Sequence, residues 1–552
     1  MARPHPLVAF LLSFVLLPLV VLSRPESSNN WGGRPTAKTD AGVVVGITAT
    51  VSTSKTVLNS FLGVPFGAQP VRFAAPKPPA PWKLPRDASQ YAPACIQQFN
   101  YPDPRRTKIL EWFNSPPPPA GESEDCLNLN VYVPQPVRKP KAVMVWLYGG
   151  GLLYGSNSVE KYDGSYLAAN NDVIVVVPNY RTNVYGFSGS PQVPVTERNT
   201  GFLDQRLALD WVRRNIAAFG GDPAKVTIFG ESAGALSVDA LVTAPPKPLN
   251  FYAAIMESGT ATFRGVPADY SSSWNILVAA MGCGNSTAAD NNAPEILACM
   301  RAVDVAKIKD YNEHARLGWA PVFDNVTSNY LARSDRLSSK ASYSKIARVP
   351  ILGGSNAHEG RLYSVNATNA TAFVRGLFPL ATDAEVSGLL AAYPGYSSMF
   401  RQLAALYTDF IFQCPARLVA LETAKAGIPS YRYYYNASFA NTQIFEDAGV
   451  YHASEIGVVL GTYPKEGSTA FQRELSTYLG KVWTDFAKDP YGSGRPPWPT
   501  VPTAMAELGG GVRAEDGPDT SGNLVNALSQ QETDAVDAGC AKFQAIYDFL
   551  GH

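Results

Sequence analysis

The sequence predicts an α/β protein whose mostly parallel central sheet carries helices on both faces. Short apolar runs rich in β-branched residues alternate along the chain with longer stretches that have apolar residues at helical spacing. Such alternation is typical of parallel sheets, because each return to the sheet needs a crossover, usually a helix. The chain has 552 residues and is 46% hydrophobic, which is enough to bury a large core around such a sheet.

The N-terminus predicts a secretory signal peptide over residues 1–23. Arg3 precedes an apolar run over residues 7–22, and a polar stretch follows. A membrane anchor is the alternative, but the run is broken by Pro18 and, at about 16 residues, is short for a span. No second long apolar run follows. We therefore expect a secreted, extracellular protein without a stable membrane anchor, folded as one domain over residues 24–552.

Buried strands are expected wherever an apolar run ends in glycine, proline or a polar turn. In chain order these are residues 141–151, 172–180, 225–230, 349–356 and 430–438. Amphipathic helices are expected at residues 204–219, after residue 234 and at residues 471–488. The proline-rich stretch at 115–125 is expected to be exposed and does not divide the chain into domains. In parallel sheets the chemistry gathers beyond the carboxyl ends of the strands.

The stretch GESAG at residues 230–234 lies where a predicted strand gives way to a helix. Small residues around Ser232 would let the strand and the helix pack closely and would leave the serine hydroxyl exposed at a sharp turn. Glycines at a strand end also serve simply as turn residues. A serine nucleophile further requires a base, an acid that orients the base, and donors for the developing oxyanion.

Histidine is scarce in this chain, and this narrows the choice of base. Apart from one histidine in the predicted signal peptide and one at the last residue, the candidates are His314, His358 and His452. In folds of this kind the order along the chain is serine, acid, histidine. His452 comes last and has apolar neighbours on both sides, whereas His314 lies in a polar segment.

Two carboxylates are candidates for the acid. Glu359 lies in a turn-rich stretch directly after a predicted strand, and Asp324 is the second choice. The glycines at 149–151 end another strand and can present backbone N–H groups to an oxyanion. Ala233 adds a donor at a helix N-terminus, where the dipole also favours an anion.

Charge and cysteine usage exclude other classes of protein. The formal net charge is +0, from 46 basic and 46 acidic residues. The chain therefore lacks the excess of basic residues that is typical of nucleic-acid-binding proteins. The six cysteines have no CxxC spacing, so a zinc site is not expected. We expect no metal and no cofactor. Five glycosylation acceptors agree with export, namely Asn285, Asn325, Asn366, Asn369 and Asn436.

Several stretches together resemble the type-B carboxylesterase family, which includes cholinesterases and Candida rugosa-type lipases. They are FLGVPFGAQPVRF from residue 61, SEDCLNLNVYVP from 123, VVPNYRTNVYGF from 176, the block at 203–235, and YHASEIGVVLG from 451. The resemblance covers most of the chain after the signal peptide, and the 203–235 block is its most specific part.

The resemblance implies an α/β-hydrolase fold and a set of site residues. Ser232 would be the nucleophile, His452 the base and Glu359 the acid, with Gly150, Gly151 and Ala233 as oxyanion donors. It implies the disulfides Cys95–Cys126, Cys283–Cys299 and Cys414–Cys540, and an ion pair between Arg72 and Glu124.

The chain departs from its relatives at two positions near the expected site. Asn183 stands where most relatives have glycine, and Leu152 follows the glycines where relatives often have phenylalanine. Leu152 is therefore expected to shape the substrate pocket. Trp112, in the loop between the first two cysteines, is expected to line the substrate entrance. That loop is a mobile lid in the lipases and a gorge wall in the cholinesterases.

The sequence thus predicts a secreted serine carboxylic-ester hydrolase that acts through an acyl-enzyme. The alternatives are a catalytically silent, cholinesterase-like adhesion or binding protein, a lipase acting on long-chain acylglycerols, and an amide hydrolase. The expected partner is a small-molecule or lipid ester. The C-terminal stretch VDAGCAKFQAIYDFL predicts an amphipathic helix that pairs with a second copy or packs on its own domain, so a monomer and a homodimer both remain open.

Overall fold

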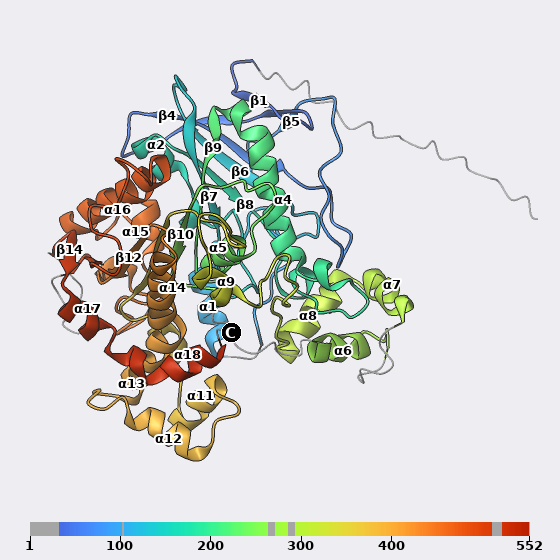
Figure 1. Cartoon of the computed structure of the whole chain (residues 1–552). Coiled ribbons are helices and arrows are strands. Elements are labelled where there is room, and N and C mark those ends of the chain that lie inside the picture. Colours follow the sequence, from blue (N-terminus) through green and yellow to red (C-terminus); the bar gives the residue numbers. More distant parts are fainter. Residues whose placement is uncertain (1–31, 102–103, 263–270, 285–292, 511–521, 551–552) are drawn as a thin grey trace, which may run out of the picture. The chain divides into compact units, whose positions relative to one another are not determined.

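An eleven-stranded sheet organises the chain, in the order β14-β13-β12-β11-β10-β9-β7-β8-β6-β4-β3 (Figure 1). The strands from β13 to β8 in this order are parallel to one another, and the remaining pairs are antiparallel. The strands are β3 Ile47–Thr50, β4 Val57–Pro65, β6 Asn128–Pro134, β7 Lys141–Leu147, β8 Ile174–Pro178, β9 Gly221–Glu231, β10 Ala253–Glu257, β11 Ile351–Asn356, β12 Ser430–Tyr435, β13 Met505–Leu508 and β14 Val525–Leu528. The predicted fold class is confirmed.

This computed structural model describes residues 32–101, 104–262, 271–284, 293–510 and 522–550. The predicted signal peptide at 1–23 and the acceptor Asn285 lie outside these residues. The chain divides into units 1–34 and 35–552, and every element discussed here belongs to the second unit. A smaller sheet joins β1 Thr36–Lys38, β2 Val43–Val45 and β5 Arg86–Asp87.

The two faces of the sheet are covered by different helices because side chains alternate along each strand. On β7, Val143 and Val145 belong to a core shared with α4 Thr200–Asn215 and α5 Ala233–Thr243. Met144 and Trp146 belong to a second core shared with α2 Ser165–Asn171 and α16 Ala470–Lys488. Figure 1 shows α4 and α16 on opposite sides of the sheet. The predicted helices at 204–219 and 471–488 are therefore present, and the first begins earlier and ends as a 3-10 turn at Phe219.

The strand order creates a crevice between β7 and β9. The chain leaves β7 toward β8 on one side, whereas β9 leads to β10 on the other side. The connections that follow β7 and β9 therefore diverge, and ligands bind at such switch points in parallel sheets. The glycines at 149–151 follow β7, and Ser232 follows β9.

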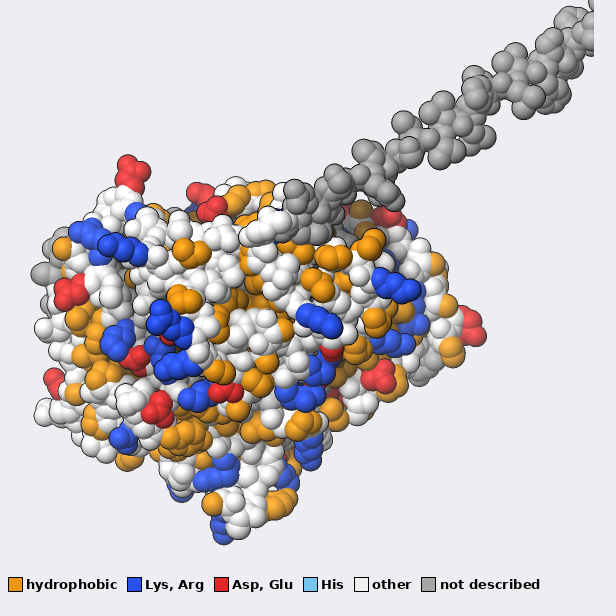
Figure 2. All heavy atoms as spheres, turned by 90° about the horizontal axis from the view of Figure 1, so that it is seen from above, with side chains coloured by type: hydrophobic (Ala, Val, Ile, Leu, Met, Phe, Trp, Pro, Cys, Tyr) orange, Lys and Arg blue, Asp and Glu red, His pale blue; other side chains and the backbone are white. Residues whose placement is uncertain are grey.

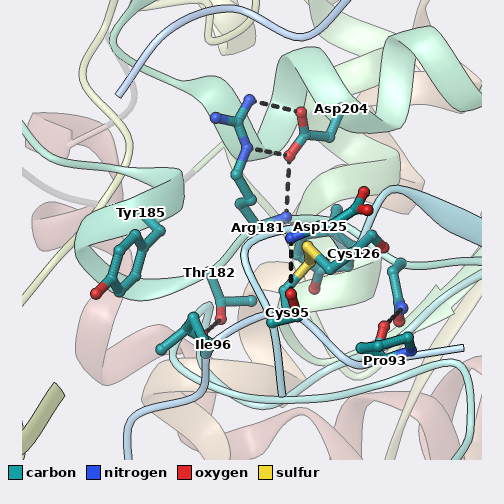
Figure 3. The surroundings of a disulfide bond; sticks show 12 residues. Pro93, Cys95, Ile96, Asp125, Cys126, Arg181, Thr182, Tyr185 and Asp204 are labelled. Carbon is teal, nitrogen blue, oxygen red and sulfur yellow. Dashed lines mark hydrogen bonds and ion pairs between the residues drawn. A yellow bond between two sulfur atoms is a disulfide. The ribbon is translucent and has the colours of Figure 1, made fainter. Parts of the chain in front are cut away.

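Three disulfides join the implied cysteine pairs: Cys95–Cys126, Cys283–Cys299 and Cys414–Cys540. Figure 3 shows the first of them beside the loop that carries Arg181 and Thr182. Arg181 is buried and donates from Nη2 to Oδ1 of Asp204 at 2.8 Å. The implied ion pair is also formed, since Nε of Arg72 donates to Oε1 of Glu124 at 2.8 Å.

The C-terminal segment packs on its own chain. Phe543 and Tyr547 are buried in a third core together with Leu403 and the Cys414–Cys540 pair. This core joins α11 Ala370–Leu377, α12 Asp383–Ala391, α13 Met399–Tyr407, α14 Cys414–Lys425 and α18 Gln544–Leu550. Packing on its own domain accounts for Phe543 and Tyr547 of the C-terminal stretch, whereas Phe549 is exposed.

The other helices are short. They include α1 Pro104–Phe113, α6 Ser271–Ala280, α7 Pro294–Ala302, α8 Val305–Ala315, α9 Ala332–Leu337, α10 Arg361–Ser364, α15 Ile456–Leu460 and α17 Gln530–Val536. In the part of the chain that the structure describes, no helix is both long and apolar enough to cross a membrane. On the face shown in Figure 2, basic and acidic side chains are interspersed among apolar ones.

Candidate active site

Ser232 occupies the sharp turn between β9 and α5. Its backbone is left-handed, with φ of 57°, and its N–H donates to the carbonyl oxygen of Glu257 at 2.8 Å. A Cβ atom on Gly230 or Gly234 would overlap the carbonyl oxygen of Leu147, so only glycine lets β9, α5 and β7 approach this closely. The GESAG pattern thus has the geometric role that the sequence predicts.

The structure brings Ser232, His452 and Glu359 together from three separate loops. Nε2 of His452 lies 2.8 Å from Oγ of Ser232, and Nδ1 lies 2.7 Å from Oε2 of Glu359. Glu359 follows β11 and is fully buried, and its other carboxylate oxygen accepts from the N–H of Asn356 at 2.7 Å. His452 lies in the connection between β12 and α15.

Two aromatic rings hold the imidazole of His452 in place. The ring of Phe412 lies 4.5 Å from it between centroids, and the ring of Tyr363 lies 5.5 Å from it. Phe412 belongs to a short π-helix, Thr408–Gln413, between α13 and α14. Helical turns of this kind are often found at functional sites.

The competing candidates lie elsewhere. Asp324 accepts hydrogen bonds from the backbone N–H groups of Val326, Thr327 and Ser328, so it caps a local turn. His314 is exposed and stacks on Tyr101. Nδ1 of His358 accepts from the N–H of Val450 at 3.2 Å, and this imidazole is engaged in fixing the loop before His452.

The expected oxyanion donors line the same cavities as Ser232. Gly150 and Gly151 have φ of 106° and 63°, a conformation that favours glycine, and Ala233 is the first residue of α5. No carbonyl or side chain among the described residues accepts a hydrogen bond from these three N–H groups. They can therefore donate to a ligand beside Ser232.

The two departures from relatives lie directly behind these glycines. Leu152 is buried with φ of 60°, and its carbonyl accepts from the N–H of Asn183 at 2.6 Å. Asn183 also has a left-handed φ, of 45°, which asparagine tolerates better than most residues. Its side-chain amide donates to the carbonyl oxygens of Ile96 at 2.7 Å and Leu153 at 3.1 Å. Asn183 thus ties the loop that carries Leu152 and Leu153 to the segment next to Cys95.

Two cavities meet at Ser232. The larger measures about 650 Å³ and is lined mostly by apolar and aromatic side chains, including Leu152, Leu236, Trp319, Phe323, Tyr407 and Phe412. The smaller cavity measures about 270 Å³ and is lined by His452, Glu231, Tyr154 and one face of α1. Leu152 is therefore among the residues that line the larger cavity.

Trp112 does not line either of these cavities. It lies on α1 and packs against Phe445, with 5.6 Å between ring centroids. The residues of α1 that reach the smaller cavity include Ile109 and Phe113, which share a neighbouring stripe of the helix at i and i+4. Because of the register of α1, the neighbouring Phe113 lines the substrate cavity, where Trp112 was expected.

A cluster of buried carboxyl groups behind the serine was missed by the sequence reasoning. Oε1 of Glu231 lies 3.2 Å from Nε2 of His452. Burial and the nearby Glu359 and Glu257 hold the pKa of Glu231 well above its ordinary value. Burial, Glu231 and Glu359 also raise the pKa of Glu455 to about 8. The available signal was the placement of Glu231 inside GESAG and of Glu455 three residues after His452, both in apolar surroundings.

The described glycosylation acceptors differ in exposure. Asn325, Asn366 and Asn369 are exposed, and the side chain of Asn369 also caps α11 by accepting from the N–H of Ala372. Asn436 is half-buried, and its Nδ2 donates to Oε1 of Glu507 at 2.8 Å. The nitrogen that a glycan would use is thus engaged at this position.

A serine, a histidine and a buried glutamate at hydrogen-bond distance, at a sheet switch point, have the geometry of a serine hydrolase of the α/β-hydrolase fold.

The model of the carboxylesterase family matches residues 33–510. The chain is 32% identical over 469 residues to an acetylcholinesterase of Bungarus fasciatus, covering 78% of this chain and 75% of the relative. It is 33% identical over 522 residues to human carboxylesterase 5A, covering 87% and 86% of the two chains. It is also 33% identical over 512 residues to a medium-chain fatty acyl-CoA hydrolase precursor of Anas platyrhynchos, covering 84% and 86%. The chain belongs to the carboxylesterase family, and the predicted enzyme class, a carboxylic ester hydrolase, is confirmed.

Proposed function

We propose that this protein is a secreted serine esterase that works through a covalent acyl-enzyme. Nε2 of His452 takes the proton of the Ser232 hydroxyl while Oγ attacks the ester carbonyl carbon. Glu359 accepts from Nδ1–H, which orients the imidazole and stabilises the imidazolium that forms. The N–H groups of Gly150, Gly151 and Ala233 donate to the oxyanion.

Collapse of the tetrahedral intermediate breaks the bond to the alcohol. His452 returns its proton to the leaving alkoxide, and the acyl group stays on Ser232. Water then enters, loses a proton to His452 and attacks the acyl carbon, which releases the acid and restores the serine. The 2.8 Å and 2.7 Å contacts of His452 with Ser232 and Glu359 are the observation that carries this proposal.

Secretion is supported by three disulfides, since such bonds persist in oxidising compartments. Exposed acceptors at Asn325, Asn366 and Asn369 support glycosylation on the same route.

Rapid mixing with p-nitrophenyl butyrate tests the mechanism. We expect a burst of nitrophenol equal to the enzyme concentration, followed by slower turnover. The burst should be absent in Ser232→Ala, with kcat lowered by roughly 10⁴ or more. A panel of p-nitrophenyl esters from acetate to palmitate, with and without emulsified lipid, distinguishes a soluble esterase from a lipase. A burst that persists in Ser232→Ala would refute the proposal.

A further inference from the structure

The larger cavity beside Ser232 has a single formal charge among the described residues that line it, and this charge belongs to Arg198. Most of the other lining residues are apolar or aromatic, with Trp319 and Phe412 among the larger side chains. Burial lowers the pKa of the Arg198 guanidinium, but an arginine in a protein remains protonated at physiological pH. The cavity therefore combines an apolar wall with one cation.

Backbone carbonyls, and not a carboxylate, hold this guanidinium. Nε of Arg198 donates to the carbonyl oxygen of Val193 at 2.8 Å, and Nη2 donates to that of Pro191 at 3.3 Å. In the described part of the chain, Nη1 donates to no acceptor. The guanidinium is thus fixed in place and keeps N–H groups that can bind a ligand.

The carboxylates of nearby residues do not neutralise Arg198. Asp324 is bound by the next residue, Asn199, but its Oδ2 accepts from that amide at 3.3 Å and from the hydroxyl of Thr327 at 2.7 Å. Oδ1 of Asp324 accepts the three backbone N–H groups of its own turn. Glu197, which precedes Arg198, is exposed and does not line the cavity.

The two cavities can be assigned to the two halves of an ester. His452 lines the smaller cavity, and this residue must protonate the leaving alkoxide, so the alcohol part belongs there. The acyl part then extends into the larger cavity, which measures about 650 Å³. The acyl part accordingly shares its cavity with Arg198.

We propose that the preferred substrates are half-esters of dicarboxylic acids, and that Arg198 binds the free carboxylate at the end of the acyl chain. The inference rests on the proposed esterase function. The apolar wall suits the methylene groups of such a chain. An ionised carboxylate can enter an apolar cavity only where it is paired, and the planar guanidinium can donate two parallel hydrogen bonds to it.

The p-nitrophenyl half-esters of adipate, suberate and sebacate test this, each beside two analogues in which the free carboxylate is replaced by a primary amide or by a trimethylammonium group. The leaving group is the same throughout, so differences in kcat/KM report the acyl end. Three chain lengths are used because the chain must reach from Ser232 to Arg198.

At the best chain length we expect the carboxylate to be preferred over the amide by about tenfold, as for hydrogen bonds to a charged group, and the ammonium to be the poorest substrate. Added salt should lower the carboxylate-to-amide ratio, because Arg198 is half-buried and the ion pair is partly screened. Arg198→Gln should bring the ratio close to one while the amide ester is still hydrolysed within a few-fold of the wild-type rate. Arg198→Lys, which keeps the charge without the planar fork, should restore part of the ratio.

Arg206→Gln is the matched control. Nη2 of Arg206 also donates to backbone carbonyls, those of Ala244 and Val326, but Arg206 does not line the larger cavity, so this variant should keep the wild-type ratio. A wild-type ratio of one or less at every chain length, a ratio that salt does not lower, or a ratio unchanged in Arg198→Gln would overturn the inference and leave the esterase intact. Failure of the wild type to hydrolyse any of these esters would overturn both.

Discussion

Nε2 of His452 lies 2.8 Å from Oγ of Ser232 and also 3.2 Å from Oε1 of Glu231. Among the described residues, Oε1 of Glu231 has no hydrogen-bond partner. A second carboxyl group therefore faces the nitrogen that exchanges a proton with the serine, on the side away from Glu359. If the carboxyl group of Glu231 is ionised, it attracts the imidazolium of His452 in competition with Glu359. If it is protonated, it does not.

The raised pKa of Glu231 predicts a small effect of removing its charge. Burial and the nearby carboxyl groups favour the neutral form of Glu231. Because glutamine is also neutral and keeps the size and an acceptor oxygen, Glu231→Gln should lower kcat/KM for a neutral ester by less than about tenfold, or 1.4 kcal/mol. Steady-state kinetics at pH 6 to 8 measures this. A loss as large as that of His452→Ala would mean that an ionised Glu231 is essential.

The triad acid is predicted to be Glu359 and not Asp324. Glu359→Gln removes the acceptor charge at Nδ1 and allows the wrong imidazole tautomer, which should lower kcat by about 10⁴. Asp324→Asn should lower the melting temperature, because Asp324 accepts three backbone N–H groups of its turn, and leave kcat within a few-fold. The two effects are separated by measuring kcat and thermal unfolding on both variants. Inactivation by Asp324→Asn in a folded protein would reverse the assignment.

The raised pKa of Glu455 predicts that the stability of the native protein falls as pH rises. Its native pKa is about 8, against about 4.3 in an unfolded chain, so the native state holds this proton more tightly. The resulting stabilisation is fully present below the unfolded pKa and is lost as pH rises toward 8. Glu455→Gln keeps an acceptor for Nδ2 of Asn356 and cannot ionise. Its melting temperature should therefore fall less between pH 5 and pH 8 than that of the wild type.

The exposed Glu474 provides the control for this measurement. Glu474→Gln should show the same pH dependence of the melting temperature as the wild type. Equal slopes for Glu455→Gln and Glu474→Gln would show that Glu455 does not bind the extra proton.

Phe113 and Trp112 are adjacent in sequence and predict opposite phenotypes. Phe113 lines the smaller cavity, so Phe113→Ala should lower kcat/KM for aryl esters about tenfold relative to methyl esters, through a loss of ~1.4 kcal/mol of contact. Trp112 packs on Phe445, so Trp112→Ala should lower the melting temperature with little change in the aryl-to-methyl ratio. A selectivity change confined to Trp112→Ala would show that the entrance lies on the other face of α1.

The fold and the three residues in contact, Ser232, His452 and Glu359, could be predicted from the sequence. Their signals are either local or follow a fixed order along the chain. The strand-to-helix turn at Ser232 is marked by GESAG and by the apolar runs around it. With few histidines in the chain, the order of serine, acid and histidine selected His452. Glu359 was separated from Asp324 by its place after a strand, since β11 ends at the same edge of the parallel sheet as β9.

The features that sequence reasoning missed depend on register and on distant contacts. The loop between Cys95 and Cys126 is rich in proline, and nothing in its composition fixes the phase of α1, so Trp112 could not be told from Phe113. The carboxyl groups of Glu231, Glu257 and Glu455 come from three separate segments. Their proximity, and therefore their raised pKa values, becomes apparent only when the strands are assembled.

Covalent labelling with diethyl p-nitrophenyl phosphate tests the central claim most directly, because the reagent is attacked by an activated serine. We predict one diethylphosphoryl group per active chain, on Ser232 in the peptide that contains GESAG, with loss of esterase activity in proportion to labelling. Ser232→Ala should remain unlabelled. Full loss of activity with the label on another residue, or an active chain with unlabelled Ser232, would contradict the account.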